Sequence, residues 1–177
     1  MTPERARFEA AYAAHGRAVL AYAMRRTDSH TAHDVLAEVF LVAWRRIDEL
    51  PAEPLPWLLG TARRVLANAR RADRRRDELA QRVVERAPTS LSSEAASVHA
   101  ETESGPVLEA LATLAEHERE ALMLVAWDGL SASEAAEVVG VRPPAFRMRL
   151  SRARRQLARA LDQRGAGHLV PEVARGR

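Results

Sequence analysis

Arginine side chains cluster in one stretch of the sequence, residues 142–164, with almost no acids to balance them. The stretch contains eight arginines and a single acid, Asp162. An ordinary solvated helix mixes both charge signs, because acids and arginines three or four residues apart form ion pairs on its surface. Guanidinium groups bind phosphate oxygens and guanine edges through a planar fork of N–H donors. The unbalanced charge therefore favours nucleic-acid binding over a plain solvated surface.

The residues around this cluster predict a helix-turn-helix. Ser131 and Glu134 have the spacing of a capping box, which starts a helix. Gly140 follows where that helix must end and the chain reverse, and Pro143 and Pro144 suit the first turn of a second helix. A core-facing stripe at helical spacing is formed by Phe146, Leu150, Ala153, Leu157 and Leu161. The arginines lie off this stripe, so the second helix could enter a DNA major groove.

A second basic helix is predicted from about Pro56 to Val84. Arginine can hold phosphate and asparagine can contact a base edge, which favours DNA binding by part of this helix. The candidate residues are Arg63, Arg64, Asn68 and Arg71. Further along, residues 74–76 are three arginines that precede Asp77 and Glu78. Two interpretations of these arginines are equally open: ion pairs with the two acids, or contact with DNA.

Composition and periodicity predict an all-α protein of two small helical domains joined by a flexible linker. The 177 residues are 47% hydrophobic, and segments with β-type alternation are hard to find. Two further helices are expected over residues 3–26 and 31–47. Serine, alanine, threonine and glutamate dominate residues 87–105, which we expect to be a mildly acidic linker. The expected parts are then residues 1–86, 87–105, 106–164 and a loose tail at 165–177.

The sequence lacks the residues that several kinds of chemistry require. The chain has no cysteine, no run of 18 apolar residues and no signal-peptide core at its N-terminus, so we expect a cytoplasmic protein with no membrane contact. His30, His33 and Asp34 could suggest a metal site, but such a cluster at a helix start is more often solvated. Asp34 and Glu38 could form a catalytic pair, yet no nucleophile, phosphate loop or ligand cluster accompanies them. We therefore expect no enzymatic activity, no cofactor and no metal, and a protein partner that meets these two carboxylates with basic residues.

Together these segments resemble a bacterial RNA polymerase sigma factor of the extracytoplasmic-function (ECF) class. The resemblance covers about residues 7–162. Three segments carry it, in this order: HDVLAEVFLVAWRRIDELP, PWLLGTARRVLANARR and LSRARRQL. It implies a helical region-two domain, a linker whose carboxylates thread toward the RNA exit path, and a region-four helix-turn-helix domain.

The resemblance also implies a role for individual residues. In the first domain, Asp34, Glu38 and Phe40 match residues that grip the clamp coiled coil of the polymerase, and Ala37 stands where glutamine is usual. The loop at 48–56 resembles one that captures a flipped base of the −10 element, and the helix that follows resembles the one that recognises this element. In the second domain, the basic positions that face the −35 element are matched by Arg147, Arg149 and Arg152, and Met148 replaces a small polar residue between the first two.

The function implied is transcription initiation. Such a factor binds core RNA polymerase at the clamp and the flap, directs it to promoter DNA, assists melting, and is held inactive by an anti-sigma factor. Without polymerase, its own affinity for DNA is expected to be weak and sensitive to salt. One alternative is a helix-turn-helix regulator that works without polymerase, with residues 1–86 as a sensor or dimerisation domain. Another is an enzyme acting on nucleic acid, for which we find no catalytic constellation.

Overall fold

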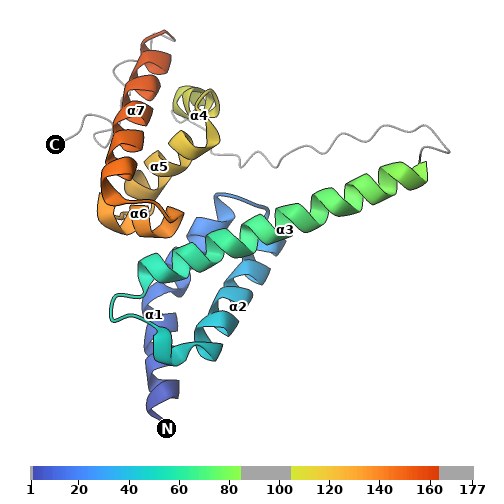
Figure 1. Cartoon of the computed structure of the whole chain (residues 1–177), viewed down its shortest axis with the longest axis vertical. Coiled ribbons are helices and arrows are strands. Elements are labelled where there is room, and N and C mark those ends of the chain that lie inside the picture. The colour runs from blue at the N-terminus through green and yellow to red at the C-terminus, as the bar shows by residue number, and fades with distance from the viewer. Residues whose placement is uncertain (1, 85–104, 164–177) are drawn as a thin grey trace. The chain divides into compact units, whose positions relative to one another are not determined.

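The computed structural model describes residues 2–84 and 105–163, with the side chains of 77–84 excepted. These residues form seven α-helices and one 3-10 helix, and no strand occurs among them, which confirms the predicted all-α class (Figure 1). The chain divides into two compact units, Met1–Val98 and His99–Arg177. The predicted tail and nearly all of the predicted linker lie outside the described residues.

The first unit is a bundle of three helices, α1 (Pro3–Met24), α2 (Ser29–Arg45) and α3 (Leu55–Val84). Each helix packs against the other two, and the 3-10 helix η1 (Ile47–Glu49) lies between α2 and α3 and contacts α1. The bounds of the three predicted helices are confirmed to within two residues. The core of the bundle is formed by Val19, Tyr22, Val35, Val39, Leu58, Leu59 and Leu66.

Only the first half of α3 packs against the bundle. Its last buried residue among the described side chains is Leu66, and Figure 1 shows the remainder of the helix running beyond α1 and α2. The Nη2 atom of Arg70 donates to the carbonyl oxygen of Arg26 at 3.0 Å, which ties α3 to the end of α1. At the other end of the bundle the guanidinium of Arg7 donates to the carbonyl of Leu50. The arginine-rich half of α3 thus projects from a bundle that is fixed at both ends.

The second unit packs three shorter helices against a long one. The short helices are α4 (Gly105–Ala112), α5 (Glu116–Ala126) and α6 (Ala132–Val139), and α7 (Pro143–Asp162) contacts all of them. The whole predicted stripe from Phe146 to Leu161 is buried, which confirms the predicted core face of α7. A polar contact also joins α5 to α7, because Gln156 Nε2 donates to Oε1 of the buried Glu118 at 3.2 Å.

The turn between α6 and α7 has the geometry that the sequence predicts. The backbone N–H of Ser131 donates to Glu134 Oε2 at 2.7 Å, and the Glu134 N–H donates to Ser131 Oγ at 3.2 Å, which completes a capping box. These hydrogen bonds lower the pKa of Glu134 below its ordinary value. Gly140 ends α6 with φ of 71°, where a side chain would be strained, and Pro143 then begins α7. The unit is a helix-turn-helix with α7 as its second helix.

We predict that the second unit depends on the burial of Phe146. Because its ring is fully buried, Phe146→Ala is expected to lower the free energy of unfolding of this unit by about 3 to 5 kcal/mol. Urea unfolding followed through NMR signals of α7 measures this. Arg155→Ala, on the exposed side of the same helix, is the control and is expected to change the value by less than about 0.5 kcal/mol. Equal losses in the two variants would contradict the assigned core face.

Candidate nucleic-acid interface

The outward side of α7 is a basic surface without neutralising acids. Six arginines of this helix lie off the buried stripe, and none of them forms an ion pair with any residue that the structure describes: Arg147, Arg149, Arg152, Arg154, Arg155 and Arg159. Arg147 and Arg152 are exposed, as predicted, whereas Arg149 is half-buried at the edge of the packed face. Arg155 was not among the predicted site residues, although its position three residues beyond Arg152 places it on the same side.

On α3 the structure brings three of the four predicted residues onto one exposed side. Arg64, Asn68 and Arg71 follow one another at helical spacing, and all three are exposed. Arg71 donates to Asn68 Oδ1, and Arg64 Nη2 donates to Thr61 Oγ1 at 3.1 Å, so the guanidinium groups are held by neutral partners. Arg63, by contrast, is half-buried and follows the buried Ala62. This surface can hold phosphate with two arginines and offer an amide to a base.

The end of the basic segment of α3 is partly neutralised. Arg76 Nη2 lies 3.0 Å from Asp73 Oδ1, one turn earlier on the helix. The predicted alternative partners Asp77 and Glu78 have side chains outside the described residues. Arg74 and Arg75 are exposed and form no ion pair with a described residue. The interpretation that residues 74–76 pair with Asp77 and Glu78 therefore stays a prediction.

An aromatic ring lies at the start of the same side of α3. Trp57 is half-buried and stands seven residues before Arg64, which is two helical turns. The guanidinium carbon of Arg46 lies 5.8 Å from the centroid of its ring, and Arg46 also pairs with Glu49. This pairing lowers the pKa of Glu49. A partly exposed indole beside a guanidinium is the kind of surface on which an unpaired base stacks. The spacing of Trp57 from Arg64 could have revealed it in the sequence.

The proline-rich loop before α3 is packed at some residues and exposed at others. Leu50, Pro54 and Pro56 are buried, whereas Asp48, Glu49 and residues 51–53 are exposed. The buried residues fix the loop to the bundle, and its exposed residues are free to contact another molecule.

The exposed side of α2 combines acids with apolar residues. Asp34 and Glu38 are both exposed, and Glu38 has no hydrogen-bond or ion-pair partner among the described residues. Leu41 and Trp44 continue the same side of the helix with 46% and 44% of their surface exposed. Ala37 lies between the two groups and is also exposed. We call these five residues the α2 surface. The sequence signal for this apolar part is that residues 31–47 would place apolar side chains over much of a helix circumference, which is typical of a helix that is buried or contacts a partner.

An apolar groove runs beside the α2 surface, between α1 and α2. It encloses about 580 Å³ and is lined by Arg5, Phe8, Glu9, Ala37, Phe40, Leu41 and Trp44. Phe40, predicted as a partner-gripping aromatic, is only 3% exposed. Its ring meets Tyr12 edge-on at 4.8 Å between centroids and Phe8 at 6.0 Å, so it forms the floor of the groove. Any direct contact between Phe40 and a partner would have to be made through this groove.

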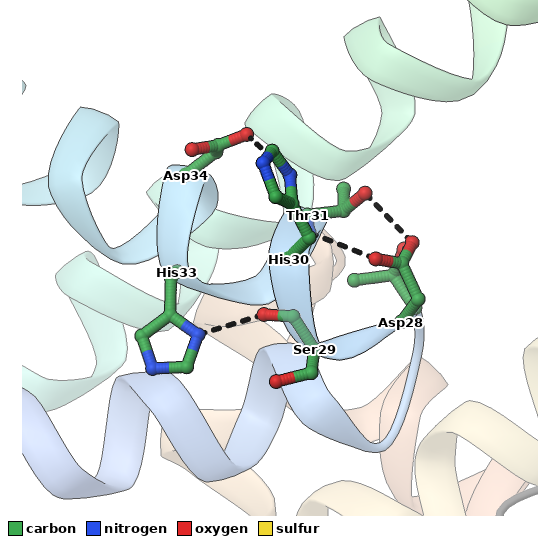
Figure 2. A network of polar contacts seen from close by, with 7 residues as sticks. Asp28, Ser29, His30, Thr31, His33 and Asp34 are labelled. Carbon is green, nitrogen blue, oxygen red and sulfur yellow. Dashed lines mark hydrogen bonds and ion pairs between the residues drawn. The ribbon is translucent and has the colours of Figure 1, made fainter.

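The start of α2 is fixed by a local network of polar contacts (Figure 2). Asp28 caps the helix by accepting from the Thr31 N–H at 3.0 Å and from Thr31 Oγ1 at 2.7 Å, which lowers the pKa of Asp28 to about 2. His33 Nδ1 lies 2.7 Å from the Ser29 carbonyl oxygen, while His30 Nδ1 lies 3.3 Å from Asp34 Oδ2. Figure 2 shows the two imidazole rings pointing apart.

Both histidines make contacts within the first turns of α2. Each ring has its own local partner, and the described residues contain no group of three side chains placed to hold a metal ion. Nor does any helix of the described residues have the length and apolar character needed to cross a bilayer.

Comparison with known proteins matches both units to parts of one family. Residues 11–76 match the family model for Sigma-70 region 2, and residues 104–157 match that for Sigma-70, region 4. A probable RNA polymerase sigma factor, RfaY of Xanthomonas campestris pv. campestris, is 33% identical over 142 residues, which cover 77% of this chain. The alignment covers 36% of that relative, so this chain spans only about a third of its length.

Solved structures share the fold. The sigma factor RpoE in complex with the anti-sigma factor NepR from Bartonella quintana superposes with a TM-score of 0.59 at 21% identity, over 88% of this chain and 96% of that one. CnrH in complex with the cytosolic domain of CnrY gives a TM-score of 0.58 at 25% identity, over 88% of both chains.

We predict a pH-dependent contribution of the Asp28 cap to stability. Because the pKa of Asp28 is lowered from 3.8 to about 2 by bonds that exist only in the folded chain, the cap stabilises fully above pH 3.8 and is lost as the pH falls through about 2. Asp28→Ala is therefore expected to lower the melting temperature at pH 7, and the difference from the wild type should shrink toward pH 2. Melting curves across this range measure it. A difference that stays constant with pH would contradict the charged cap.

Proposed function

The chain belongs to the sigma-70 family, in its ECF class, and from this premise we propose that it is a transcription initiation factor that binds core RNA polymerase and directs it to promoters. The observation that carries the proposal is the presence, in one chain, of two basic helical surfaces and one acidic and apolar surface. The two basic surfaces suit binding to DNA, and the acidic and apolar surface suits binding to a protein. A factor that joins polymerase to a two-part promoter needs this combination.

The proposed contact with the −35 element is made by α7. A helix-turn-helix places its second helix in the major groove, where its first residues meet base edges and neighbouring cations meet phosphates. Arg147, Arg149 and Arg152 are the proposed contacts. Arg155 extends the same surface and is added to them because it is exposed and has no acid partner among the described residues.

The proposed contact with the −10 element is made by α3 and the loop before it. Arg64 and Arg71 hold the backbone, and Asn68, released from Arg71, meets a base edge. Unpairing costs a few kcal/mol per base, and stacking of an extruded base on an aromatic ring offsets part of that cost. Trp57 is the ring that we propose for this stacking, and melting then needs no catalytic group in this chain.

The proposed contact with polymerase is made by the α2 surface. Asp34 and Glu38 supply negative charge for basic residues of the clamp, and Leu41 and Trp44 supply exposed apolar area that a partner can bury. Ala37 keeps the apolar area continuous between them. A sequestering anti-sigma protein is proposed as a further partner of this chain, and the site of action is the cytoplasm, where polymerase and promoter DNA are found.

The first test reverses one charge on the α2 surface. Glu38 is exposed and makes no contact that holds the fold, so Glu38→Arg is expected to fold normally and to weaken binding to core polymerase about tenfold or more. Titration of fluorescently labelled chain with core enzyme measures the Kd. The matched control is Glu4→Arg, an exposed acid on α1. Unchanged binding by Glu38→Arg, or equal loss in the control, would contradict the proposed surface.

The second test concerns the two basic surfaces. Arg152→Ala and Arg64→Ala each remove one proposed phosphate contact, so each is expected to weaken the complex of holoenzyme with promoter DNA and to reduce the slope of log K against log salt by about one. Affinity for core polymerase is expected to stay at its wild-type value. Arg17→Ala, an exposed arginine on α1, is the matched control. The assignment is wrong if the control changes the salt slope as much as the other two variants do.

A further inference from the structure

An apolar side chain occupies the centre of the basic surface of α7. Met148 is 66% exposed, while the other exposed large apolar residues among the described side chains lie between 38% and 48%. It is two residues from both Phe146 and Leu150, which are buried, so it points away from the core. Arg147 and Arg149 flank it in the sequence, and Arg152 follows one turn later.

The first turn of α7 has no side chain that can hydrogen-bond to a base. Pro143, Pro144 and Ala145 are all exposed, and the next two outward residues are Arg147 and Met148. The first residues of the second helix are those that meet base edges in a helix-turn-helix. At this place the helix offers hydrocarbon and a thioether, and the arginines lie around it.

Only one feature of the major groove matches the apolar side chain of Met148. Donors and acceptors of guanine, adenine and cytosine need polar partners, whereas the C5-methyl group of thymine is apolar and contacts apolar side chains. We propose that Met148 is a specificity-determining residue that recognises a thymine methyl in the −35 element. This inference rests on the proposed function, because it requires that α7 enter the major groove of promoter DNA.

Met148 and the arginines on either side of it have different roles in this proposal. Arg147 and Arg152 are exposed on either side of Met148 and can hold phosphates, which fixes the position of the helix but carries no sequence information. Met148 then makes the helix prefer thymine at one position of the −35 element. Methionine suits this contact because its unbranched, polarisable side chain adapts to the surface that it meets.

The test uses the full chain with core polymerase and a promoter library randomised in the −35 element. After selection, each thymine of the enriched sequence is replaced in turn by deoxyuridine, which removes only the methyl group. At one position the wild-type holoenzyme is expected to lose about fourfold in affinity, which corresponds to one buried methyl group. Met148→Ser is expected to bind the thymine and deoxyuridine promoters equally, and Met148→Leu is expected to keep the preference.

Met24→Ser, an exposed methionine on α1, is the matched control and is expected to keep the fourfold preference. The inference is overturned if no position shows a methyl effect, or if Met148→Ser retains it, while holoenzyme still selects promoters and Arg152→Ala still weakens binding. If core polymerase with this chain enriches no sequence at all, the proposed function fails, and this inference fails with it.

Discussion

The structure depends on one constraint on α7. One side of this helix is buried in the core, and this burial determines where the arginines on the rest of the helix lie. On α7 a continuous apolar stripe fixes the rotation of the helix. Four of the arginines off this stripe are then exposed, and Arg149 and Arg154 are half-buried beside it. No described acid lies within ion-pair distance of them. Their mutual repulsion is relieved when a polyanion approaches, because phosphates replace the counterions around the helix. The hydrophobic core of the second unit therefore also determines which surface can bind DNA.

The α2 surface follows the opposite arrangement. Its charges are negative, and between them lies apolar area that no described residue covers fully. The groove beside it is floored by an aromatic cluster in which Phe8, Tyr12 and Phe40 pack edge to face or stacked. Such an apolar floor with acids beside it suits a protein that presents basic and apolar side chains together. Opposite signs of charge on the surfaces of α2 and α7 would keep DNA from the surface that we assign to polymerase.

Much of this could be predicted from the sequence, because the strongest signals are local. The capping box at Ser131, the reversal at Gly140 and the stripe that begins at Phe146 each depend on residues a few positions apart, and all three are confirmed. The same holds for the exposure of Arg64, Asn68 and Arg71, since helical periodicity fixes the side of α3 on which they lie.

The remaining features arise from contacts between different helices. The periodicity of a single helix carries no information about these contacts. Phe40 is buried because α1 brings Phe8 and Tyr12 over it, and the motif that suggested a gripping aromatic carries no information about α1. Arg149 and Arg63 are half-buried because each lies at the border between the packed and exposed sides, where a neighbouring helix decides the outcome. The boundary residues of a helical surface are therefore the least predictable part of such a site.

Footprinting on a selected promoter tests the central claim most directly. Core polymerase with this chain is expected to protect two separate stretches of DNA, with permanganate-reactive, unpaired thymines in the downstream one, while the chain alone protects neither at the same concentration. If the chain alone gave the complete footprint and core polymerase added nothing, the account of a polymerase-borne factor with two basic surfaces would be contradicted.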